Sequence, residues 1–290
     1  MIHRRPPISL SITILGIGLC ISAVSAGAEG LQYPLSVAVH PSGTIYLADR
    51  NLPGVWQVNG DQLKLLFQGS KKFRTPLNAV RCVALDADGK LVAGDTSTCA
   101  IYRFDDAGQP QPVTDLNKVA ERIGTPMDIV TDADGNFLVS DLELHRIVRV
   151  PKAGGKVEEF ASVNAPRGLF YDSQKQLWVI SGRKLLRIAP DGKQETVADD
   201  KAFGSDATFP HTVVVNGEGI AYVCDGYAKA IWRVAPGKQP EKWASGAPFV
   251  NPVGMDLQGD KLLVIDPHAR ALFEIDAAGK VTQRELKIAP

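Results

Sequence analysis

Two arginines, a histidine and an aspartate have the chemistry of a small charged site. Arg81, Asp128, Arg167 and His211 lie far apart in the chain, but each stands near the start of a similar segment. A guanidinium group offers a planar fork that suits a carboxylate or phosphate, and a protonated imidazole adds positive charge. If the four side chains meet, they favour an anionic ligand, unless Asp128 pairs with Arg167 and cancels the charge. Whether they meet depends on the elements that carry them.

The segments belong to an internal repeat. Six copies begin at Tyr33, Ala79, Thr125, Ala165, Phe209 and Asn251. Each copy continues with a polar turn, a run rich in β-branched and aromatic residues, and two further short runs. Four short strands in a unit of this length are typical of a propeller blade, which buries both faces of its sheet only against neighbouring blades. We therefore predict an all-β fold: a six-bladed β-propeller over residues 29–290, with four antiparallel strands per blade.

The copies resemble NHL repeats, and "APRGLFYD" and "NPVGMDLQGDKLLVID" fit that pattern best. The second copy departs from it, with Val80 in place of the opening proline. A more distant resemblance is to the gluconolactonase, or senescence-marker, propellers and to streptogramin lyase-like propellers. This resemblance implies an alternative function, a metal-dependent lactone hydrolase or lyase. In gluconolactonases it implies a divalent cation, often calcium, bound at the channel mouth by Glu, Asn and Asp oxygens near the blade openings.

The residues at those blade openings are a poor match to a calcium site. They are Leu35, Arg81, Met127, Arg167, His211 and Val253. Hard cations need oxygen ligands, and arginines oppose a cation. Asp128 is the one carboxylate that we expect near this ring. We therefore expect neither a metal nor another cofactor and disfavour catalysis, while the hydrolase or lyase stays open as the alternative.

Five aspartates recur at the end of the second run: Asp49, Asp95, Asp141, Asp225 and Asp266. A side chain that recurs in every unit answers a need that every unit has. We expect these carboxylates to accept hydrogen bonds from exposed amides in the turn that follows. The turns Asp86–Gly89 and Asp132–Gly135 are interpreted in the same way, with Asp opening the turn and Gly allowing a positive φ.

Strand direction divides the propeller into two faces. The loops between second and third strands and the crossovers between blades must share one face, which we call the top face. The long crossovers Gly69–Asn78, Asp115–Gly124 and Asp199–Thr208 lie there, and variable loops on a regular scaffold are the usual place for binding. We predict a site for a peptide, sugar or anionic small molecule at the channel mouth. We also expect binding to strengthen as His211 gains a proton near pH 6.5.

Three residues in the loops between second and third strands could either rim the site or simply be exposed. These residues are His145, Tyr227 and His268.

The N-terminal segment has the features of a secretory signal. Arg4 and Arg5 precede an apolar run over residues 8–24, and small residues follow it up to Ala28. We predict that residues 1–28 are a signal peptide and that the mature protein is periplasmic or extracellular; an uncleaved N-terminal anchor is the alternative. No membrane span is expected after cleavage. With 32 basic and 32 acidic residues, the composition indicates neither nucleic acid nor an anionic membrane as partner.

Export leaves Cys82, Cys99 and Cys224, an odd number. Cys82 and Cys99 are expected two strands apart, about 10 Å at the spacing of strands, which is too far for a disulfide. We expect free, buried thiols. We also expect the ring to close by side-chain packing, because the sixth copy has a fourth strand of its own.

Overall fold

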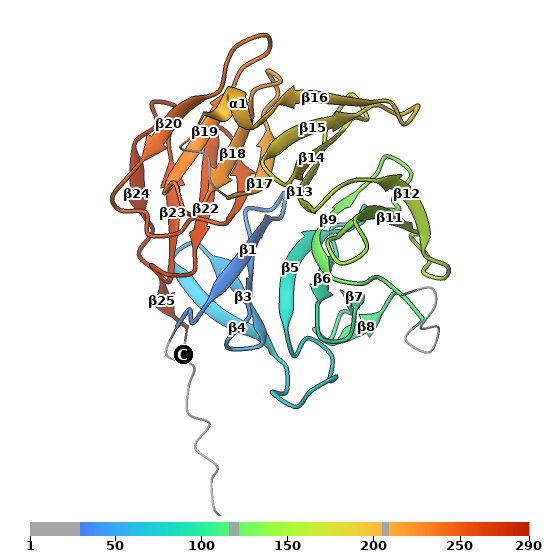
Figure 1. Cartoon of the computed structure of the whole chain (residues 1–290). Helices are drawn as coiled ribbons and strands as arrows, with labels where there is room; N and C mark the ends of the chain where they lie inside the picture. The colour runs from blue at the N-terminus through green and yellow to red at the C-terminus, as the bar shows by residue number, and fades with distance from the viewer. Residues whose placement is uncertain (1–29, 116–121, 205–208, 290) are drawn as a thin grey trace, which may run out of the picture.

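The computed structural model describes residues 30–115, 122–204 and 209–289, and it contains six β-sheets arranged around a central channel (Figure 1). Each sheet has four antiparallel strands in simple up-and-down order, and one of them carries a fifth strand. The prediction of an all-β, six-bladed propeller is confirmed. The one helix among the described residues, α1 (Asp200–Phe203), is a single turn in the crossover between blades four and five.

The strands follow the repeat copy by copy. Blade one contains β1 (Pro34–Val39), β2 (Ile45–Asp49), β3 (Gly54–Asn59) and β4 (Gln62–Gln68). Blade two contains β5 (Val80–Leu85), β6 (Leu91–Asp95), β7 (Ala100–Phe104) and β8 (Pro110–Pro112). Blade three contains β9 (Pro126–Thr131), β10 (Phe137–Asp141), β11 (Arg146–Val150) and β12 (Glu158–Ser162). Blade four contains β13 (Pro166–Tyr171), β14 (Leu177–Ser181), β15 (Lys184–Ile188) and β16 (Gln194–Ala198). Blade five contains β17 (Pro210–Val215), β18 (Ala221–Asp225), β19 (Ala230–Val234) and β20 (Glu241–Ser245). Blade six contains β21 (Gly254–Gln258), β22 (Lys261–Asp266), β23 (Ala271–Ile275) and β24 (Val281–Gln283).

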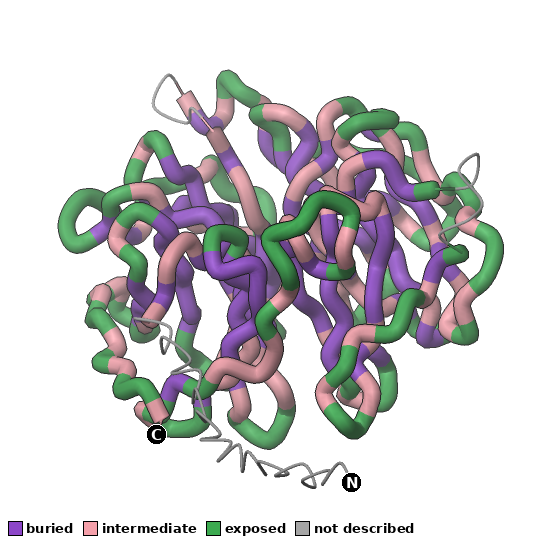
Figure 2. Tube along the Cα trace, turned by 90° about the horizontal axis from the view of Figure 1, so that it is seen from below, coloured by how far each residue is buried: buried purple, intermediate pink, exposed green. Residues whose placement is uncertain are grey.

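The apolar core lies between the blades. The second strands β6, β10 and β14 are buried along their whole length, while the connecting loops are mostly exposed (Figure 2). Each hydrophobic cluster contains residues of two neighbouring blades. In one of them, Cys82 of blade two packs with Ile129 and Phe137 of blade three. A buried side chain of this size contributes about 1.5–3 kcal/mol. The inner strands are therefore fixed on both faces, and variation is left to the loops.

The five recurrent aspartates have the structural role that we predicted for them. All five are fully buried. Asp141 accepts a hydrogen bond from the amide of Leu144 in the loop after β10, at 3.3 Å. It also accepts bonds from the amides of Gly124 and Thr125 at the end of the preceding crossover, both at 3.0 Å. The crossover contact was not foreseen: the carboxylate ties the loop after the second strand to the chain that enters the first.

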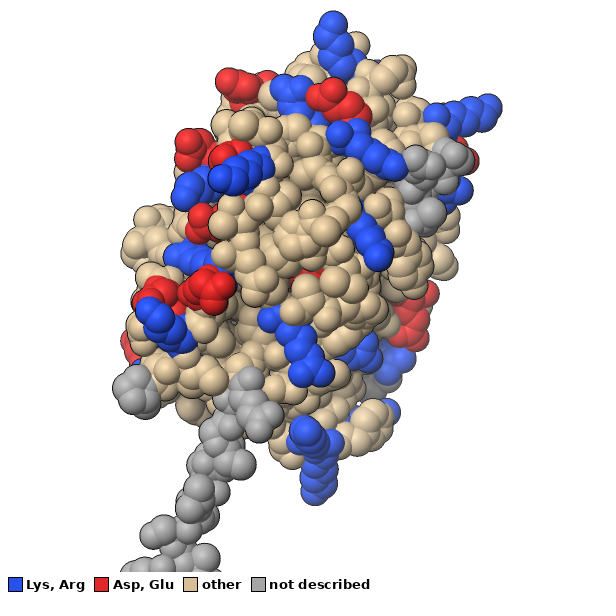
Figure 3. Space-filling view, turned by 90° about the vertical axis from the view of Figure 1, so that its left-hand side faces the viewer, with Lys and Arg blue, Asp and Glu red and all other residues tan. Residues whose placement is uncertain are grey.

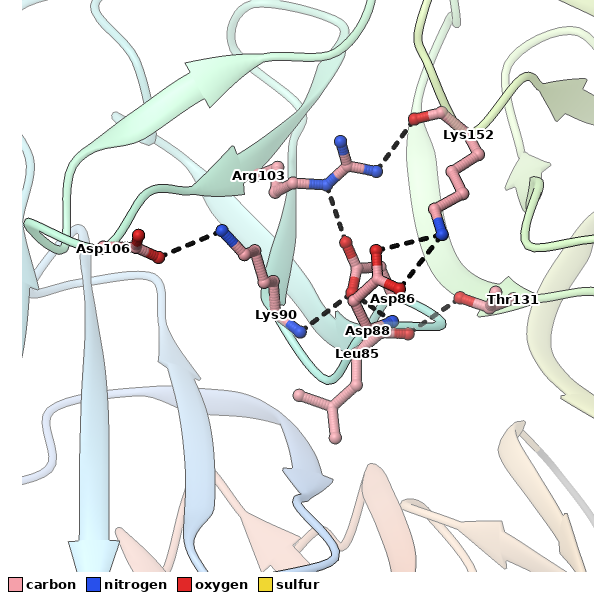
Figure 4. A network of polar contacts seen from close by, with 8 residues as sticks. All are labelled: Leu85, Asp86, Asp88, Lys90, Arg103, Asp106, Thr131 and Lys152. Carbon is pink, nitrogen blue, oxygen red and sulfur yellow. Dashed lines mark hydrogen bonds and ion pairs between the residues drawn. The ribbon is translucent and has the colours of Figure 1, made fainter.

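The opposite face, which we call the bottom face, is held by short turns with paired charges (Figure 4). Asp86 accepts the amides of Asp88 and Lys90, and Gly89 has φ 78°, as the turn prediction requires. The Asp86 carboxylate also lies 2.8 Å from Nε of Arg103. Lys152 of blade three reaches Asp88 of blade two at 3.0 Å. The contacts of Asp86 hold the turn of blade two, and the ion pair between Lys152 and Asp88 connects blade two to blade three.

The ring closes through packing and through a strand that the sequence did not reveal. Blades one and six share one hydrophobic cluster, in which Leu35 and Leu47 meet Leu263 and Ile265, so the predicted packing is confirmed. In addition, β25 (Lys287–Ile288) pairs in parallel with β4 as the fifth strand of blade one. The Lys287 amine lies 2.6 Å from Asp61, which fastens the end of the chain to that blade.

Two predictions about the chain ends and the thiols are tested in part. Cys82, Cys99 and Cys224 are free, as expected; Cys82 and Cys224 are buried, but Cys99 is only partly so. The predicted signal segment, residues 1–28, lies outside the described residues. Among the residues that the structure describes, no helix is long and apolar enough to cross a membrane.

Candidate functional site

The first strands of all six blades surround a channel of about 300 Å³. At its top end a wider hollow of about 490 Å³ opens between the loops, and we call this hollow the mouth cavity. The six residues predicted at the channel mouth all line it: Leu35, Arg81, Met127, Arg167, His211 and Val253. Loops between second and third strands add Arg50, Thr96, Leu142 and Tyr227. The residues that precede or open the first strands add Tyr33, Thr125, Phe209 and Asn251.

The charge of the mouth cavity is of one sign. Arg50, Arg81 and Arg167 line it, and none of the described residues that line it is an aspartate or glutamate. Asp128 lines the channel but not the mouth cavity. Of the four candidate residues, the structure thus brings Arg81, Arg167 and His211 together at the mouth and places the aspartate below them.

Arg167 lies on an aromatic face. Its guanidinium carbon is 4.2 Å from the centre of the Phe209 ring, and its Nη1 donates to the carbonyl of Gly182 at 3.1 Å. Tyr227 stacks on Phe209, with ring centres 5.2 Å apart and planes at 28°. Among the described residues no ion pair joins Arg167 to Asp128, so the predicted alternative of a cancelling pair is wrong. Because β13 and β17 are neighbours, the arginine reaches the phenylalanine of the next blade instead.

Arg81 stands deeper, in the wall that the mouth cavity shares with the channel. Burial lowers the pKa of its guanidinium, and Arg50 lowers it further, while Asp128 acts in the opposite direction. Burial also lowers the pKa of Arg167. Arginine keeps its proton in proteins, so these shifts mean that both cations are poorly solvated and gain from an anion placed between them.

His211 is not the proton switch that we expected. Burial lowers the pKa of its imidazole to about 3, and the positive charges of Arg81 and Arg167 act in the same direction. Its ring meets Phe209 edge-on, with centres 4.8 Å apart. The pKa near 6.5 on which the expected pH dependence of binding rested is therefore not the pKa of His211 in this structure. At neutral pH the imidazole is an uncharged hydrogen-bonding group.

Two carboxylates, not one, face the channel below the mouth. Asp128 accepts the amide of Leu169 in blade four at 2.9 Å, and Asp256 accepts the amide of Val39 in blade one at 2.7 Å. Burial raises the pKa of Asp128 to about 7 and that of Asp256 to about 6. The expectation that Asp128 is the one carboxylate near the ring is thus corrected. Gly254 is the blade-six equivalent of Asp128. Because side chains alternate between the two sides of a strand, Asp256, two residues later, faces the same side, so the sequence could have identified it.

Asp128 is the second residue after the opening proline of its blade, and the residues at this position in other blades contact the neighbouring blade. Ser36 Oγ accepts the amide of Val83 at 3.1 Å, and Thr212 Oγ1 donates to the carbonyl of Val253 at 2.6 Å. At the corresponding Gly168, a Cβ atom would lie 2.5 Å from Cα of Thr212, so a side chain does not fit. This position fits one first strand against the next, which explains why its residue type varies.

Several residues of the mouth cavity were missed in the sequence, although their positions were visible. Arg50 directly follows a recurrent aspartate, as Thr96 and Leu142 do. Tyr33 and Phe209 stand at the starts of their repeat copies, directly before the opening proline. Of the loop residues considered as a rim, Tyr227 lines the cavity. His268 instead contacts the Tyr33 hydroxyl at 3.3 Å, and His145 accepts the amide of Ala165 at 2.9 Å.

The donor atoms at the mouth do not fit a divalent cation. The six channel-mouth residues include two arginines and three apolar side chains, and they offer no carboxylate. Among the described residues, no group of three or more His, Cys, Asp or Glu side chains is arranged to hold a metal ion. The calcium ligands implied by the gluconolactonase resemblance are therefore not available here.

Known structures share this fold. Virginiamycin B lyase from Staphylococcus aureus superimposes with a TM-score of 0.67 at 15% identity, over 89% of this chain and 86% of that one. A gluconolactonase from Xanthomonas campestris gives a TM-score of 0.69 at 17% identity, over 88% and 87%. The nidogen/laminin complex gives 0.65 at 18%, over 86% and 91%. No protein-family model and no curated protein sequence matches the chain.

The similarity to gluconolactonase and streptogramin lyase propellers is thus confirmed at the level of the fold. These neighbours include both propeller enzymes and a binding propeller, so the shared fold does not decide between catalysis and binding.

Proposed function

We propose that this protein is an exported binding module whose mouth cavity takes the acidic group of a small molecule, sugar acid or peptide. The observation that carries the proposal is the set of three arginines in a cavity whose described lining contains no carboxylate. Such a set of cations costs free energy when the cavity is empty, and a bound anion removes that cost.

The shape of the cavity supports a ligand with a planar or ring-shaped part. Its volume of about 490 Å³ is within the usual size range of small-molecule pockets. Phe209 and Tyr227 form a stacked pair beside Arg167, so an aromatic or sugar ring could lie against this wall while its acidic group meets the guanidinium. The uncharged His211 adds a hydrogen bond near the same point.

The alternative, a metal-dependent lactone hydrolase or lyase, has only the similarity of fold in its favour. The channel-mouth residues do not supply the oxygens that a divalent cation needs. His211, with a pKa of about 3, is a weak base at neutral pH, and general bases work best with a pKa near the working pH. Binding therefore fits the site better than catalysis does.

Calorimetry with matched ligands tests the proposed site. Glucuronate and glucose share a sugar ring and differ in the carboxylate. We expect glucuronate to bind and glucose not to bind. Arg167→Ala should weaken glucuronate binding, and Lys229→Ala, which removes an exposed cation outside the mouth cavity, should not. Equal heats with both sugars, or equal effects of the two variants, would contradict the proposal.

Export is the second part of the proposal and needs its own test. It is supported by the basic residues, the apolar run and the small residues within positions 1–28. Intact-mass measurement of the protein from its native host should give a mature chain that starts near Gly27 or Glu29. Recovery of the full-length chain in the membrane fraction would show the uncleaved anchor instead.

A further inference from the structure

We infer that the top face around the mouth cavity is an interaction surface for an acidic, partly apolar polypeptide segment that lies across the channel. Four large apolar side chains among the described residues are exposed on this face: Phe73 (72%), Tyr227 (69%), Leu144 (49%) and Val250 (43%). They come from crossovers or from loops between second and third strands, whereas the bottom turns supply none of the exposed large apolar side chains in the described chain. These four side chains are separate apolar contact points around the rim of the top face, not one continuous patch.

Phe73 is held outward by a well-bonded loop. The crossover that carries it is fixed by a hydrogen bond from the Arg74 amide to Ser97 Oγ at 3.2 Å and from the Asn78 amide group to the Ser70 carbonyl at 2.9 Å. Arg74 has φ 59° and lies over the Phe73 ring at 5.3 Å. The exposed ring and guanidinium therefore form one unit, of the aromatic and arginine kind that is enriched in protein interfaces.

The neutral net charge conceals a separation between the faces. Cations predominate in the described top loops: Arg50, Lys71, Lys72, Arg74, Arg122, Arg183, Lys201, Lys229 and Arg270. The acids there are fewer when the buried recurrent aspartates are set aside: Asp115, Glu143, Asp199 and Asp200. In the bottom turns acids such as Asp86, Asp88, Asp132 and Asp134 outnumber the cations, which include Lys90, Lys152 and Lys175. The side view in Figure 3 shows an uneven distribution of charge, with Asp and Glu mainly in its left half and Lys and Arg in both halves.

The apolar side chains are placed in opposite sectors of the ring. In a six-bladed ring, blade two lies opposite blade five and blade three opposite blade six. Phe73 precedes blade two and Tyr227 belongs to blade five, while Leu144 belongs to blade three and Val250 precedes blade six. The arginines of the mouth cavity lie between these sectors. A segment that crosses the mouth can therefore place acidic residues over the arginines and apolar residues on both sides.

An extended polypeptide fits these features better than a membrane surface does. A bilayer is flat and would not send a charge into a recessed cavity, and the acids Glu143 and Asp200 stand on the same face and would oppose anionic lipids. The acidic centre of the segment rests on the proposed function of the mouth cavity. The apolar contacts on either side do not depend on that function, so the interaction surface and the anion site can be tested separately.

The experiment uses fluorescence anisotropy with a labelled synthetic peptide that has central glutamates flanked by leucine and phenylalanine. Two matched peptides replace the glutamates by glutamine or the apolar residues by serine. Phe73→Ser and Val250→Ser remove apolar groups outside the mouth cavity, and Ile288→Ser, on β25, is the control for an exposed apolar residue elsewhere. We expect the first two to weaken binding about five- to tenfold, the scale of one lost apolar contact, and the control to have no effect.

The outcomes separate the two proposals. If the peptide binds no more tightly than the serine-substituted peptide, or Phe73→Ser and Val250→Ser have no effect, the inference is overturned, while glucuronate binding can still support the mouth cavity. If both variants weaken peptide binding but Arg167→Ala does not, the flanking surface is supported and the proposed anion site is contradicted. Binding to phosphatidylglycerol vesicles that depends on Phe73, without binding of the peptide, would assign this face to a membrane and overturn the inference.

Discussion

The guanidinium of Arg167 in blade four lies 4.2 Å above the ring of Phe209 in blade five, and this pair forms one wall of the mouth cavity. This contact holds the cation across the joint between two blades. Arg167→Lys keeps the charge but loses the planar group and its paired donors. We therefore expect Arg167→Lys to weaken glucuronate binding by about 1 kcal/mol, and Arg167→Ala by roughly 1.5–3 kcal/mol. Calorimetry measures both, and full retention of affinity by the alanine variant would rule out this contact.

Asp128 makes stability depend on pH in an unusual direction. Its pKa rises from 3.8 to about 7 in the folded protein, so the folded state binds more protons than the unfolded state between these values. Its contribution to stability is therefore present below about pH 4 and is lost as pH rises through 7. Relative to the parent protein, Asp128→Asn should gain stability as pH rises from 4.5 to 8, by about 2 kcal/mol after allowance for solvent in the channel. Urea unfolding at the two pH values measures this gain, and a constant difference would contradict it.

His211 acts in the opposite direction. Because its pKa falls from 6.5 to about 3, its contribution to stability is present above pH 6.5 and is lost as pH falls towards 3. His211→Gln, which stays neutral, should become more stable than the parent protein below pH 5, by about 2 kcal/mol. Between pH 8 and 5.5 glucuronate affinity should have the same pH dependence in His211→Gln as in the parent protein, because His211 stays neutral over this range. A rise in affinity over that range that is absent in His211→Gln would show that the ligand draws a proton onto the imidazole.

The fold could be predicted because each blade repeats one local pattern. Alternating apolar residues, Asp and Gly turns, and an aspartate at the end of the second strand all act within one copy, so the sequence displays them directly. Ring geometry then follows, and it places Arg81, Arg167 and His211 at one mouth. β25 escaped notice because it has only two residues and its partner, β4, lies at the other end of the chain.

The chemistry of the site depends on contacts between blades, which a single copy does not encode. Charge alone suggests a pair between Arg167 and Asp128 as one alternative, but in the fold the guanidinium contacts the Gly182 carbonyl and the Phe209 ring of the following blade. The protonation of His211 depends on its burial and on two arginines from other blades. Side-chain type and spacing identified three of the charged or titratable residues at the mouth, whereas their partners and pKa values required the three-dimensional structure.

The recurrent aspartates offer a comparison within the chain, because blade four carries Ser181 where the other five blades carry aspartate. Asp141 accepts the amides of Gly124 and Thr125 and the Nε of Arg146 at 3.0–3.1 Å, whereas Ser181 donates one hydrogen bond to the Asn164 carbonyl at 2.7 Å. Replacing the buried carboxylate by alanine leaves several donors unsatisfied, so Asp141→Ala should cost about 3–5 kcal/mol. Ser181→Ala should cost about 1 kcal/mol. Urea unfolding of the two variants gives both values. Similar losses would mean that the aspartate does not stabilise the junction between loop and crossover as we infer.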